Sequence, residues 1–338
     1  MPAQGVVTAA FGRQFYVTAD GGERLVCVMR GKRSDAAVGD RVHLAATGGG
    51  GGVIDEVLPR RTLLQRSDGR RTKLFAANLT RIAVVLAPDP PPSEELLMRA
   101  LVAAHEAGLG AAIVLNKADL LDGGGRQAAT GPVTAEPVPA DPVAVRPAAV
   151  DRAGVEPVAP VERERRADVA GRIALYEALG VPVVRIAAKR DPQGAREALA
   201  PWLQGQTTLL LGQSGMGKST LVNALVPDAA LATQAISQAL STGRHTTTFA
   251  KSFALPGGGT IIDSPGFQEF GLGHLSLSQV QAAMPDLAPY VGGCRFYNCT
   301  HRNEPGCAVR AAVASGALDA RRHGLYVQLA GQLERTGR

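Results

Sequence analysis

The chain has 338 residues, of which 45% are hydrophobic and 20% charged, with a formal net charge of +6 and a pI near 9.4. These values are typical of a soluble globular protein with room for two or three domains, and the positive charge suits a polyanionic partner. No apolar run approaches the roughly 20 residues needed to cross a bilayer, and residues 1–11 lack the features of a signal peptide. We therefore expect a cytoplasmic protein.

The first 58 residues contain five short runs rich in strand-forming residues, with Gly and Asp between them. These runs are Gly5–Thr8, Gln14–Ala19, Arg24–Val28, Asp40–Ala45 and Val53–Leu58. They predict a small barrel of the OB or SH3-like type, and a basic stretch over 60–73 follows it. OB barrels often bind single-stranded nucleic acid; the alternative is a barrel that only packs on its neighbour. Cys27, inside a strand, is expected to be a buried apolar residue.

From residue 81 the pattern changes to alternating strands and helices. The strand Ile82–Leu86, the helix Glu94–Ala107 with Ser93 as its N-cap, and the strand Ala111–Leu115 predict a parallel sheet. Residues from 123 to about 160, rich in Gly, Pro, Ala and Val, are expected to form a disordered insertion. The pattern then resumes, and short helical stretches are expected beyond residue 271. The resumed elements are the helix Ala167–Leu179 and the strands Pro182–Ile186 and Thr207–Leu211.

The segment 212–219 reads G-Q-S-G-M-G-K-S and matches the phosphate-binding pattern G-x-x-x-x-G-K-[ST]. It follows an apolar strand and opens the helix Ser219–Leu225, the context in which backbone N–H groups surround a phosphate. Lys218 is expected to bridge the β- and γ-phosphates, and Ser219 to ligate Mg²⁺. The predicted nucleotide-binding residues of this loop are Gly212, Gln213, Ser214, Gly215, Met216, Gly217, Lys218, Ser219 and Thr220.

A second motif, N-K-A-D over 116–119, follows the strand Ala111–Leu115. The Asp119 carboxylate can accept from the N1–H and the exocyclic amine of guanine, a donor pair that adenine lacks. Asn116 can donate to guanine O6 or N7, and the stem of Lys117 can cover the base. Alone, these four residues would more often be a charged loop. Beside a phosphate-binding loop they indicate GTP rather than ATP.

Two further segments predict the Mg²⁺ and γ-phosphate contacts. Asp263, after the strand Thr260–Ile262, is expected to hold Mg²⁺ through water, and the Gly266 N–H to meet the γ-phosphate. In the polar run G-R-H-T-T-T over 243–248, Thr247 is preferred among the three threonines to complete the Mg²⁺ shell when GTP is bound.

The residue after the D-S-P-G segment bears on catalysis. Phe267 stands where many GTPases carry a water-orienting Gln, and a phenyl ring cannot accept a hydrogen bond from water. Intrinsic turnover should therefore be slow. The missing polar group is expected from His245 or from a partner; a structural role for His245 is the alternative.

The order of the motifs differs from that of ordinary small G proteins, in which the phosphate-binding loop comes first. Here the guanine motif at 116–119 precedes the loop at 212–219, which precedes the D-S-P-G segment. The same sheet can form if its ends are joined and the chain is opened elsewhere. The sequence therefore predicts a circularly permuted P-loop GTPase domain, with its switch region directly before the C-terminal cysteine-containing region.

Near the C-terminus three cysteines and one histidine follow the pattern C-x₄-C-x-H-x₅-C. Three thiolates and an imidazole suit a closed, structural Zn²⁺ site, with one ion per chain and Cys299 and His301 on one side if their segment is extended. Unligated reduced cysteines are the alternative. The predicted ligands are Cys294, Cys299, His301 and Cys307.

With these residues assembled, the chain resembles the RsgA (YjeQ) family of ribosome small-subunit-dependent GTPases over nearly its whole length. The resemblance implies an OB-fold that binds ribosomal RNA, GTP hydrolysis stimulated by the small subunit, and a role in its late maturation. It also implies that 243–248 is the switch, with His245 as a suspected catalytic residue. Where the family tends to have Ser-Ala near guanine O6, this chain has Ala187 and Ala188, which keep the backbone contact possible.

We thus expect an OB-like barrel over 1–65, a permuted α/β GTPase domain over 74–270 and a helical zinc-binding domain over 271–338. The expected function is a GTP hydrolase that acts as a switch on the small ribosomal subunit and its rRNA, as a monomer without a membrane partner. Two alternatives stay open: a GTP-dependent binding module in which hydrolysis is incidental, and a zinc-finger regulator of mRNA or DNA. The second lacks the spacing and recognition helix of such readers.

Overall fold

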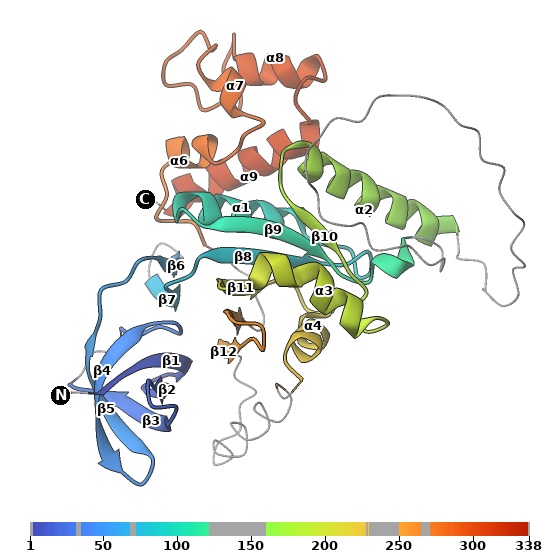
Figure 1. The fold of residues 1–338 in the computed structure, drawn as a ribbon. Helices are drawn as coiled ribbons and strands as arrows, with labels where there is room; N and C mark the ends of the chain where they lie inside the picture. Colours follow the sequence, from blue (N-terminus) through green and yellow to red (C-terminus); the bar gives the residue numbers. More distant parts are fainter. Residues whose placement is uncertain are drawn as a thin grey trace, which may run out of the picture.

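A computed structural model describes residues 3–31, 35–67, 72–121, 160–227, 229, 250–264 and 271–336. Its N-terminal strands form a five-stranded barrel with the order β1-β2-β3-β5-β4, closed by pairing of β1 with β4 (Figure 1). The pairing is antiparallel except between β3 and β5, an arrangement that fits the predicted OB type. Phe15, Val17 and Cys27 are among the fully buried side chains that fill it. The strands are β1 (Ala3–Phe11), β2 (Gln14–Ala19), β3 (Arg24–Met29), β4 (Arg41–Gly48) and β5 (Gly51–Val57).

The second body is a twisted sheet with the strand order β10-β9-β8-β11-β13-β12. All neighbouring pairs are parallel except β12 and β13, as expected where helices cover both faces of a sheet. One residue pair joins this sheet to the barrel, Ala9 of β1 with Lys251 of β12. The strands are β8 (Arg81–Leu86), β9 (Gly110–Leu115), β10 (Val183–Arg185), β11 (Thr207–Leu211), β12 (Lys251–Ala254) and β13 (Thr260–Asp263).

Alternate residues of β8 point to opposite faces of this sheet. Ile82 and Val84 belong to the core shared with α1 and α2, whereas Ala83 and Val85 belong to the core shared with α3 and α4. These strands are apolar on both faces, which explains why they read as continuous apolar runs. The helices are α1 (Glu94–Glu106), α2 (Pro160–Ala178), α3 (Pro192–Leu203) and α4 (Lys218–Leu225), with a short 3₁₀ turn, η1, at Ala118–Leu120.

The C-terminal helices pack on the α1 and α2 side of the sheet (Figure 1). Gln328 of α9 donates to Glu95 of α1 at 2.8 Å. Buried Arg322 pairs with Asp286 at 2.7 Å, and its guanidinium lies 5.1 Å from the ring centre of Tyr176 in α2. These helices are α6 (Leu277–Ala282), α7 (Ala288–Val291), α8 (Ala308–Ala314) and α9 (Ala320–Thr336).

The structure corrects several expectations. The helix expected at Ala167–Leu179 begins at Pro160, so residue 160 does not belong to the insertion, whose other residues lie outside the described part. The helix α3 was not predicted, and neither was a hairpin of β6 (Leu63–Ser67) and β7 (Thr72–Ala77), which overlaps the basic stretch 60–73 after the barrel. Within the described residues, no helix has the length and apolar character that spanning a bilayer requires.

Two arginines, one from the basic stretch 60–73 and one from the basic run 321–323, are structural. Arg60 donates to Asp40, which is fully buried, at 2.7 Å, and Arg322 pairs with Asp286. A buried carboxylate needs such a partner because its desolvation is costly. Both guanidinium groups therefore bind carboxylates within the chain.

Candidate nucleotide-binding and metal-binding sites

The predicted nucleotide-binding segments meet at one edge of the parallel sheet. The phosphate-binding loop follows β11, the guanine motif follows β9, and Ala187 and Ala188 follow β10, while Asp263 ends β13. Because parallel strands have their carboxyl ends at the same edge, these segments converge there. The permuted order thus gives the topology that the sequence predicts.

The phosphate-binding loop needs glycine where it turns tightly. Gly217 precedes α4 and has a φ of 84°, a conformation that side chains rarely adopt. A Cβ atom at this position would lie 2.3 Å from Nδ2 of Asn116, and one at Gly212 would lie 2.4 Å from the carbonyl oxygen of Val85. The loop is therefore packed directly on the guanine motif and on β8. Ser219, at the start of α4, is exposed, and Thr220 is half-buried.

Lys218 and Asp263 are two partly desolvated charged groups that influence each other at the sheet edge. Lys218 is 9% exposed, and its Nζ donates to the carbonyl oxygens of Gly212 and, at 3.3 Å, of Gln213. Burial lowers the pKa of Lys218 and raises the pKa of Asp263, and each charge partly offsets the effect on the other. Lys251 also lies near enough to oppose the rise in the Asp263 pKa.

One oxygen of Asp263 has no partner in the part of the chain that the structure describes. Its Oδ1 is buried without a hydrogen bond to any described residue. A buried carboxylate oxygen left unpaired is unusual in a folded protein. This oxygen fits a role toward Mg²⁺ or its water, because carboxylate oxygens are ligands that Mg²⁺ favours.

Asn116 is 2% exposed and joins three loops. Its Nδ2 donates to the carbonyl oxygen of Met216 at 3.0 Å, and its Oδ1 accepts from the Ala188 N–H at 3.0 Å. The predicted contact to the base is therefore accompanied by two contacts within the protein, which the sequence analysis missed. Within the described residues, the Ala187 N–H has no hydrogen-bond partner.

The other two residues of the guanine motif differ in their partners. Lys117 has a φ of 54°, and its Nζ donates to the carbonyl oxygen of Asp89 at 2.7 Å. Asp119 lies half-buried in η1, and its carboxylate makes no hydrogen bond or ion pair with the described residues. The Asp119 carboxylate is thus available to an incoming donor pair.

Gln213 connects the phosphate-binding loop to helix α1. Its Oε1 accepts from the backbone N–H of Ser93 at 2.8 Å, and the Ser93 hydroxyl caps α1 by accepting from the Leu96 N–H. The predicted cap is thus confirmed. Since α1 also contacts α9, the loop and the C-terminal helices share one helix as a neighbour.

The predicted switch segment 243–248, which includes His245 and Thr247, lies outside the described residues, and so do Gly266 and Phe267. Their predicted roles are therefore not tested by the geometry.

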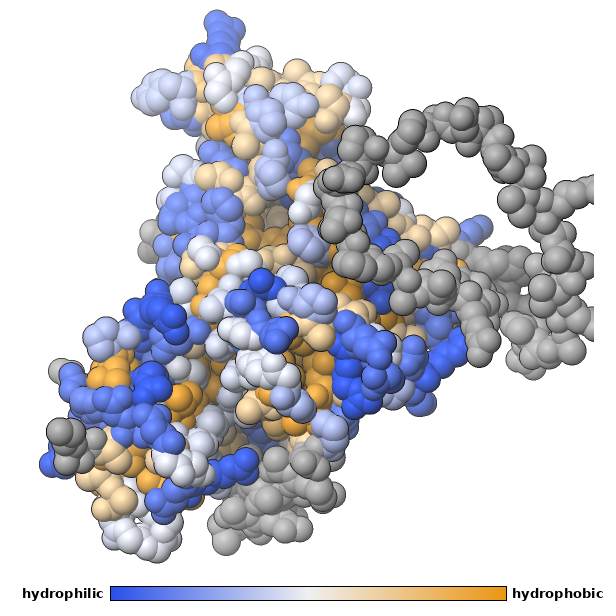
Figure 2. All heavy atoms as spheres, in the orientation of Figure 1, coloured by the Kyte–Doolittle hydropathy of each residue, from blue (hydrophilic) through white to orange (hydrophobic). Residues whose placement is uncertain are grey.

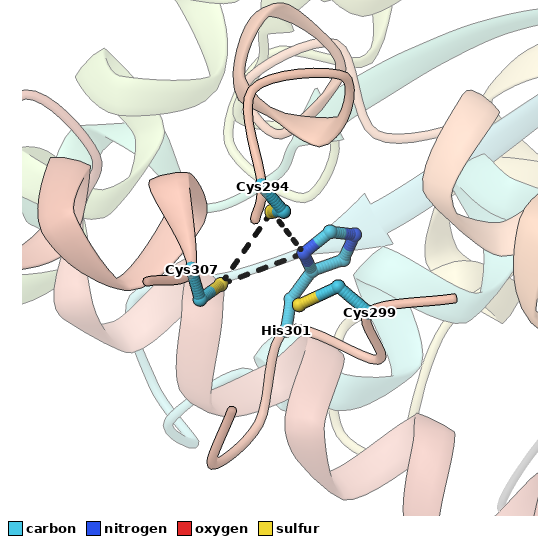
Figure 3. A group of neighbouring side chains, drawn as sticks. All are labelled: Cys294, Cys299, His301 and Cys307. Atoms are coloured by element: carbon cyan, nitrogen blue, oxygen red, sulfur yellow. Dashed lines mark hydrogen bonds between the residues drawn. The ribbon is translucent and has the colours of Figure 1, made fainter. Parts of the chain in front are cut away.

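The predicted zinc ligands converge in the C-terminal helical region (Figure 3). Their four ligand atoms all lie within 4.8 Å of one another. Nδ1 of His301 lies 3.3 Å from Sγ of Cys294 and 3.6 Å from Sγ of Cys307, and the latter two sulfur atoms are 3.9 Å apart. This donor set and spacing fit a tetrahedral metal such as Zn²⁺, which three cysteines and one histidine commonly hold.

The burial of the thiols bears on how they would bind a metal. Burial raises the pKa of the Cys299 thiol to about 12. Burial opposes ionisation of Cys294 as well, but the backbone N–H of Ala308, 3.3 Å from its sulfur, helps bring the net pKa below the ordinary value. A metal would have to displace these protons, because the thiolate is the ligand form.

The loop that carries the histidine is shaped by a residue that the sequence analysis did not single out. Glu304 accepts from the backbone N–H groups of Thr300, Arg302 and Asn303, at 2.7 to 3.1 Å. Although burial opposes it, hydrogen bonds lower the pKa of Glu304 to about 2, the one from the Thr300 hydroxyl first and those from backbone N–H groups of the loop after it. His301 has a φ of 59°, so this piece is a turn and not the extended segment that we considered. The position of this acidic residue between the predicted ligands His301 and Cys307 was the sequence signal that could have identified it.

The comparisons with known proteins agree with this geometry. The family model described as RsgA GTPase matches residues 57–135 and 160–273. The chain is 48% identical over 328 residues to the small ribosomal subunit biogenesis GTPase RsgA of Burkholderia pseudomallei strain K96243, covering 97% of this chain and 91% of that protein. The crystal structure of YjeQ from Thermotoga maritima covers all of both chains with a TM-score of 0.64 at 25% identity. YloQ, described as a circularly permuted GTPase, gives a TM-score of 0.61 at 22% identity, covering 99% of this chain and 96% of that one.

Proposed function

The chain belongs to the RsgA GTPase family, and from that premise we propose that it is a nucleotide-controlled switch that acts on the small ribosomal subunit during late maturation. The single observation that supports the proposal most is the convergence of the phosphate-binding loop, the guanine motif and Asp263 at one sheet edge. The relatives' names supply the subunit as the partner.

In this proposal the chain's own residues hold GTP in three places. The Lys218 ammonium leaves its contacts with the carbonyl oxygens of Gly212 and Gln213 and bridges the β- and γ-phosphates. The Asp119 carboxylate accepts from guanine N1–H and the exocyclic amine. The Ala187 N–H donates to guanine O6, since the Ala188 N–H is already bonded to Asn116.

Mg²⁺ would be held by Ser219 and Thr247 directly and by Asp263 through water, and when bound it neutralises charge that develops on the phosphates. The unpaired Asp263 Oδ1 supports this placement. We assign Gly266 to the γ-phosphate and His245 to the orientation of the attacking water. Phe267 cannot orient that water, so contact with the subunit would have to bring His245 into place.

The flanking regions would bind the particle. We propose that the barrel over 1–65 binds ribosomal RNA. The GTPase domain comprises 74–270, and 271–338 form a helical domain that one Zn²⁺ stabilises. The 65 and 74 boundaries fall within the β6–β7 hairpin, which joins the first two bodies. The proposal also includes that the protein is monomeric and cytoplasmic.

The test of the switch is co-sedimentation with purified small ribosomal subunits in GDP, in a non-hydrolysable GTP analogue and without nucleotide. The proposal expects the GTP analogue to give the highest affinity. Equal binding in all three conditions would overturn it. The second candidate is a binding module in which hydrolysis is incidental. It is favoured by Phe267, which stands where many GTPases carry a water-orienting Gln. The two candidates differ in a single-turnover experiment that follows GTP hydrolysis and release from the subunit together. In a switch, the protein dissociates from the subunit at the rate of hydrolysis; in a binding module, the two rates are unrelated.

A further inference from the structure

The segment between two metal ligands, Cys294 and Cys299, carries two exposed aromatic rings. Phe296 is 41% exposed and Tyr297 is 103% exposed; among the described residues they are the only aromatic side chains in the group of large, exposed hydrophobic residues. Aromatic rings usually contribute to a fold by being buried. The Tyr297 ring contributes nothing to the packing of this one, so its place in the sequence needs another explanation.

We refer to residues 295–298 as the aromatic tip. Its backbone is closed by two hydrogen bonds, from the Arg295 N–H to the Gly306 carbonyl at 3.0 Å and from the Cys299 N–H to the Phe296 carbonyl at 3.2 Å. The metal-ligand residues at both ends fix it further. The rings are thus presented from a preorganised turn, which reduces the entropy lost on binding. The segment that joins α7 to α8 lies at the end of the C-terminal domain away from the barrel, and this end carries hydrophilic side chains (Figures 1 and 2).

The charge around the aromatic tip is positive. Residues 287–318 contain three arginines and a single acidic residue, Glu304, whose carboxylate accepts from backbone N–H groups of its own loop. The acidic residues just outside this range, Asp286 and Asp319, are bonded to the Arg322 side chain and to backbone N–H groups at the start of α9. Arg302 pairs with Glu334. Arg295 and Arg310 are exposed, and the Arg295 guanidinium lies 5.5 Å from the centre of the Phe296 ring. The surface around the rings therefore suits an anionic partner.

We propose that the aromatic tip stacks on an unpaired base of ribosomal RNA, with the Tyr297 ring against the base and Arg295 toward the adjoining phosphate. Unpaired RNA bases stack on aromatic rings and guanidinium planes, and positive charge next to the ring favours RNA over an apolar protein surface. This inference rests on the proposed function, since that function supplies the subunit as the partner.

The test measures the affinity of three Tyr297 variants for purified small ribosomal subunits with the non-hydrolysable GTP analogue. Tyr297→Ala should weaken binding by about tenfold, as expected for the loss of one stacked base, and Tyr297→Phe should bind like the wild type. Tyr297→Leu keeps apolar bulk but not a flat ring, and it should behave like the Ala variant. Zinc content and hydrolysis without subunits should be unchanged in all three variants.

Several results would overturn the inference. Binding restored by Leu, or unchanged in Tyr297→Ala, would show that stacking is not used. A photoreactive amino acid at position 297 should cross-link to ribosomal RNA, and a cross-link to a ribosomal protein would contradict the choice of partner. Wild-type protein that binds subunits in no nucleotide state would overturn the proposed function as well. Wild-type binding that Tyr297→Ala leaves intact would overturn this inference alone.

Discussion

The Asn116 side chain donates to the main-chain carbonyl of Met216 across 3.0 Å and so fastens the guanine motif to the phosphate-binding loop. The same side chain accepts from the Ala188 N–H. The two halves of the nucleotide site come from segments a hundred residues apart in the chain. A single buried amide therefore holds the base-recognising and phosphate-recognising loops in one arrangement.

Replacing this amide should weaken the protein and its nucleotide affinity together. In Asn116→Asp the carboxylate can still accept from Ala188, but it repels the Met216 carbonyl, which costs about 1–3 kcal/mol in the free energy of unfolding. Urea denaturation and nucleotide titration measure the two effects. The control is Asp119→Asn, because the wild-type Asp119 carboxylate has no partner in the described protein. It should leave stability unchanged and shift the base preference from guanine toward xanthine, which has a carbonyl where guanine has its exocyclic amine. Normal GTP affinity in Asn116→Asp would contradict this account.

Asp263→Asn should separate metal binding from stability. Burial raises the pKa of Asp263 above its ordinary value of 3.8, so folding disfavours the ionised form. Its contribution to stability is present below that ordinary value and is lost as the pH rises through the raised pKa. At pH 7 and without nucleotide, the Asn variant should therefore unfold at a higher urea concentration than the wild type, and the difference should vanish toward pH 3.

The same variant should lose the part of its GTP affinity that depends on Mg²⁺, because the amide has no negative charge and only one oxygen to offer the metal or its water. Titration of GTP with and without Mg²⁺ provides the measurement. An Asn variant less stable than the wild type at pH 7, or one with full Mg²⁺ dependence, would show that Asp263 has a different role.

Removing a zinc ligand should unfold the C-terminal helices and spare the sheet. Cys307→Ser should lose the metal, measured as zinc per chain, while Cys27→Ala, far from the ligands and inside the barrel, should retain it. Zinc affinity should rise with pH between 6 and 8, because binding must displace thiol protons, including that of Cys299 with its pKa of about 12. Full zinc content in Cys307→Ser would contradict the ligand assignment.

The buried pair of Arg322 and Asp286 should be important for docking of the C-terminal helices. Arg322→Ala leaves the Asp286 carboxylate buried without its partner, which typically costs about 3–5 kcal/mol. Thermal unfolding and limited proteolysis of the C-terminal region are the measurements. The neighbouring Arg321→Ala removes an exposed pair with Asp168 and should change little. Equal effects of the two substitutions would argue against a special role for the buried pair.

The sequence predicted the elements that carry strong local signals. The strand Thr207–Leu211 and the cap at Ser93 agree with the structure residue for residue, because an apolar run beside a glycine-rich turn and a serine before a helical pattern are local features. The helix Pro192–Leu203 was missed, since it contains an internal proline at Pro201, which ordinarily argues against a helix.

Features that depend on distant residues could not be predicted. The pairing of Arg60 with Asp40 and of Arg322 with Asp286 joins residues that no local pattern connects. From the sequence, these arginines are only members of stretches rich in basic residues. The same limit applies to Asn116, whose predicted base contact follows from its motif but whose bonds to Met216 and Ala188 follow only from the folded sheet. The chemistry of a motif can be read from neighbouring residues in the sequence, whereas the contacts that position the motif depend on the tertiary structure.

The central claim is tested most directly by the rate of GTP hydrolysis by the purified protein, with and without small ribosomal subunits, beside an ATP control. The account predicts slow hydrolysis alone, strong stimulation by the subunits, no hydrolysis of ATP, and loss of stimulation in His245→Ala with GTP binding retained. Fast hydrolysis without subunits, or a rate that the subunits leave unchanged, would contradict the account.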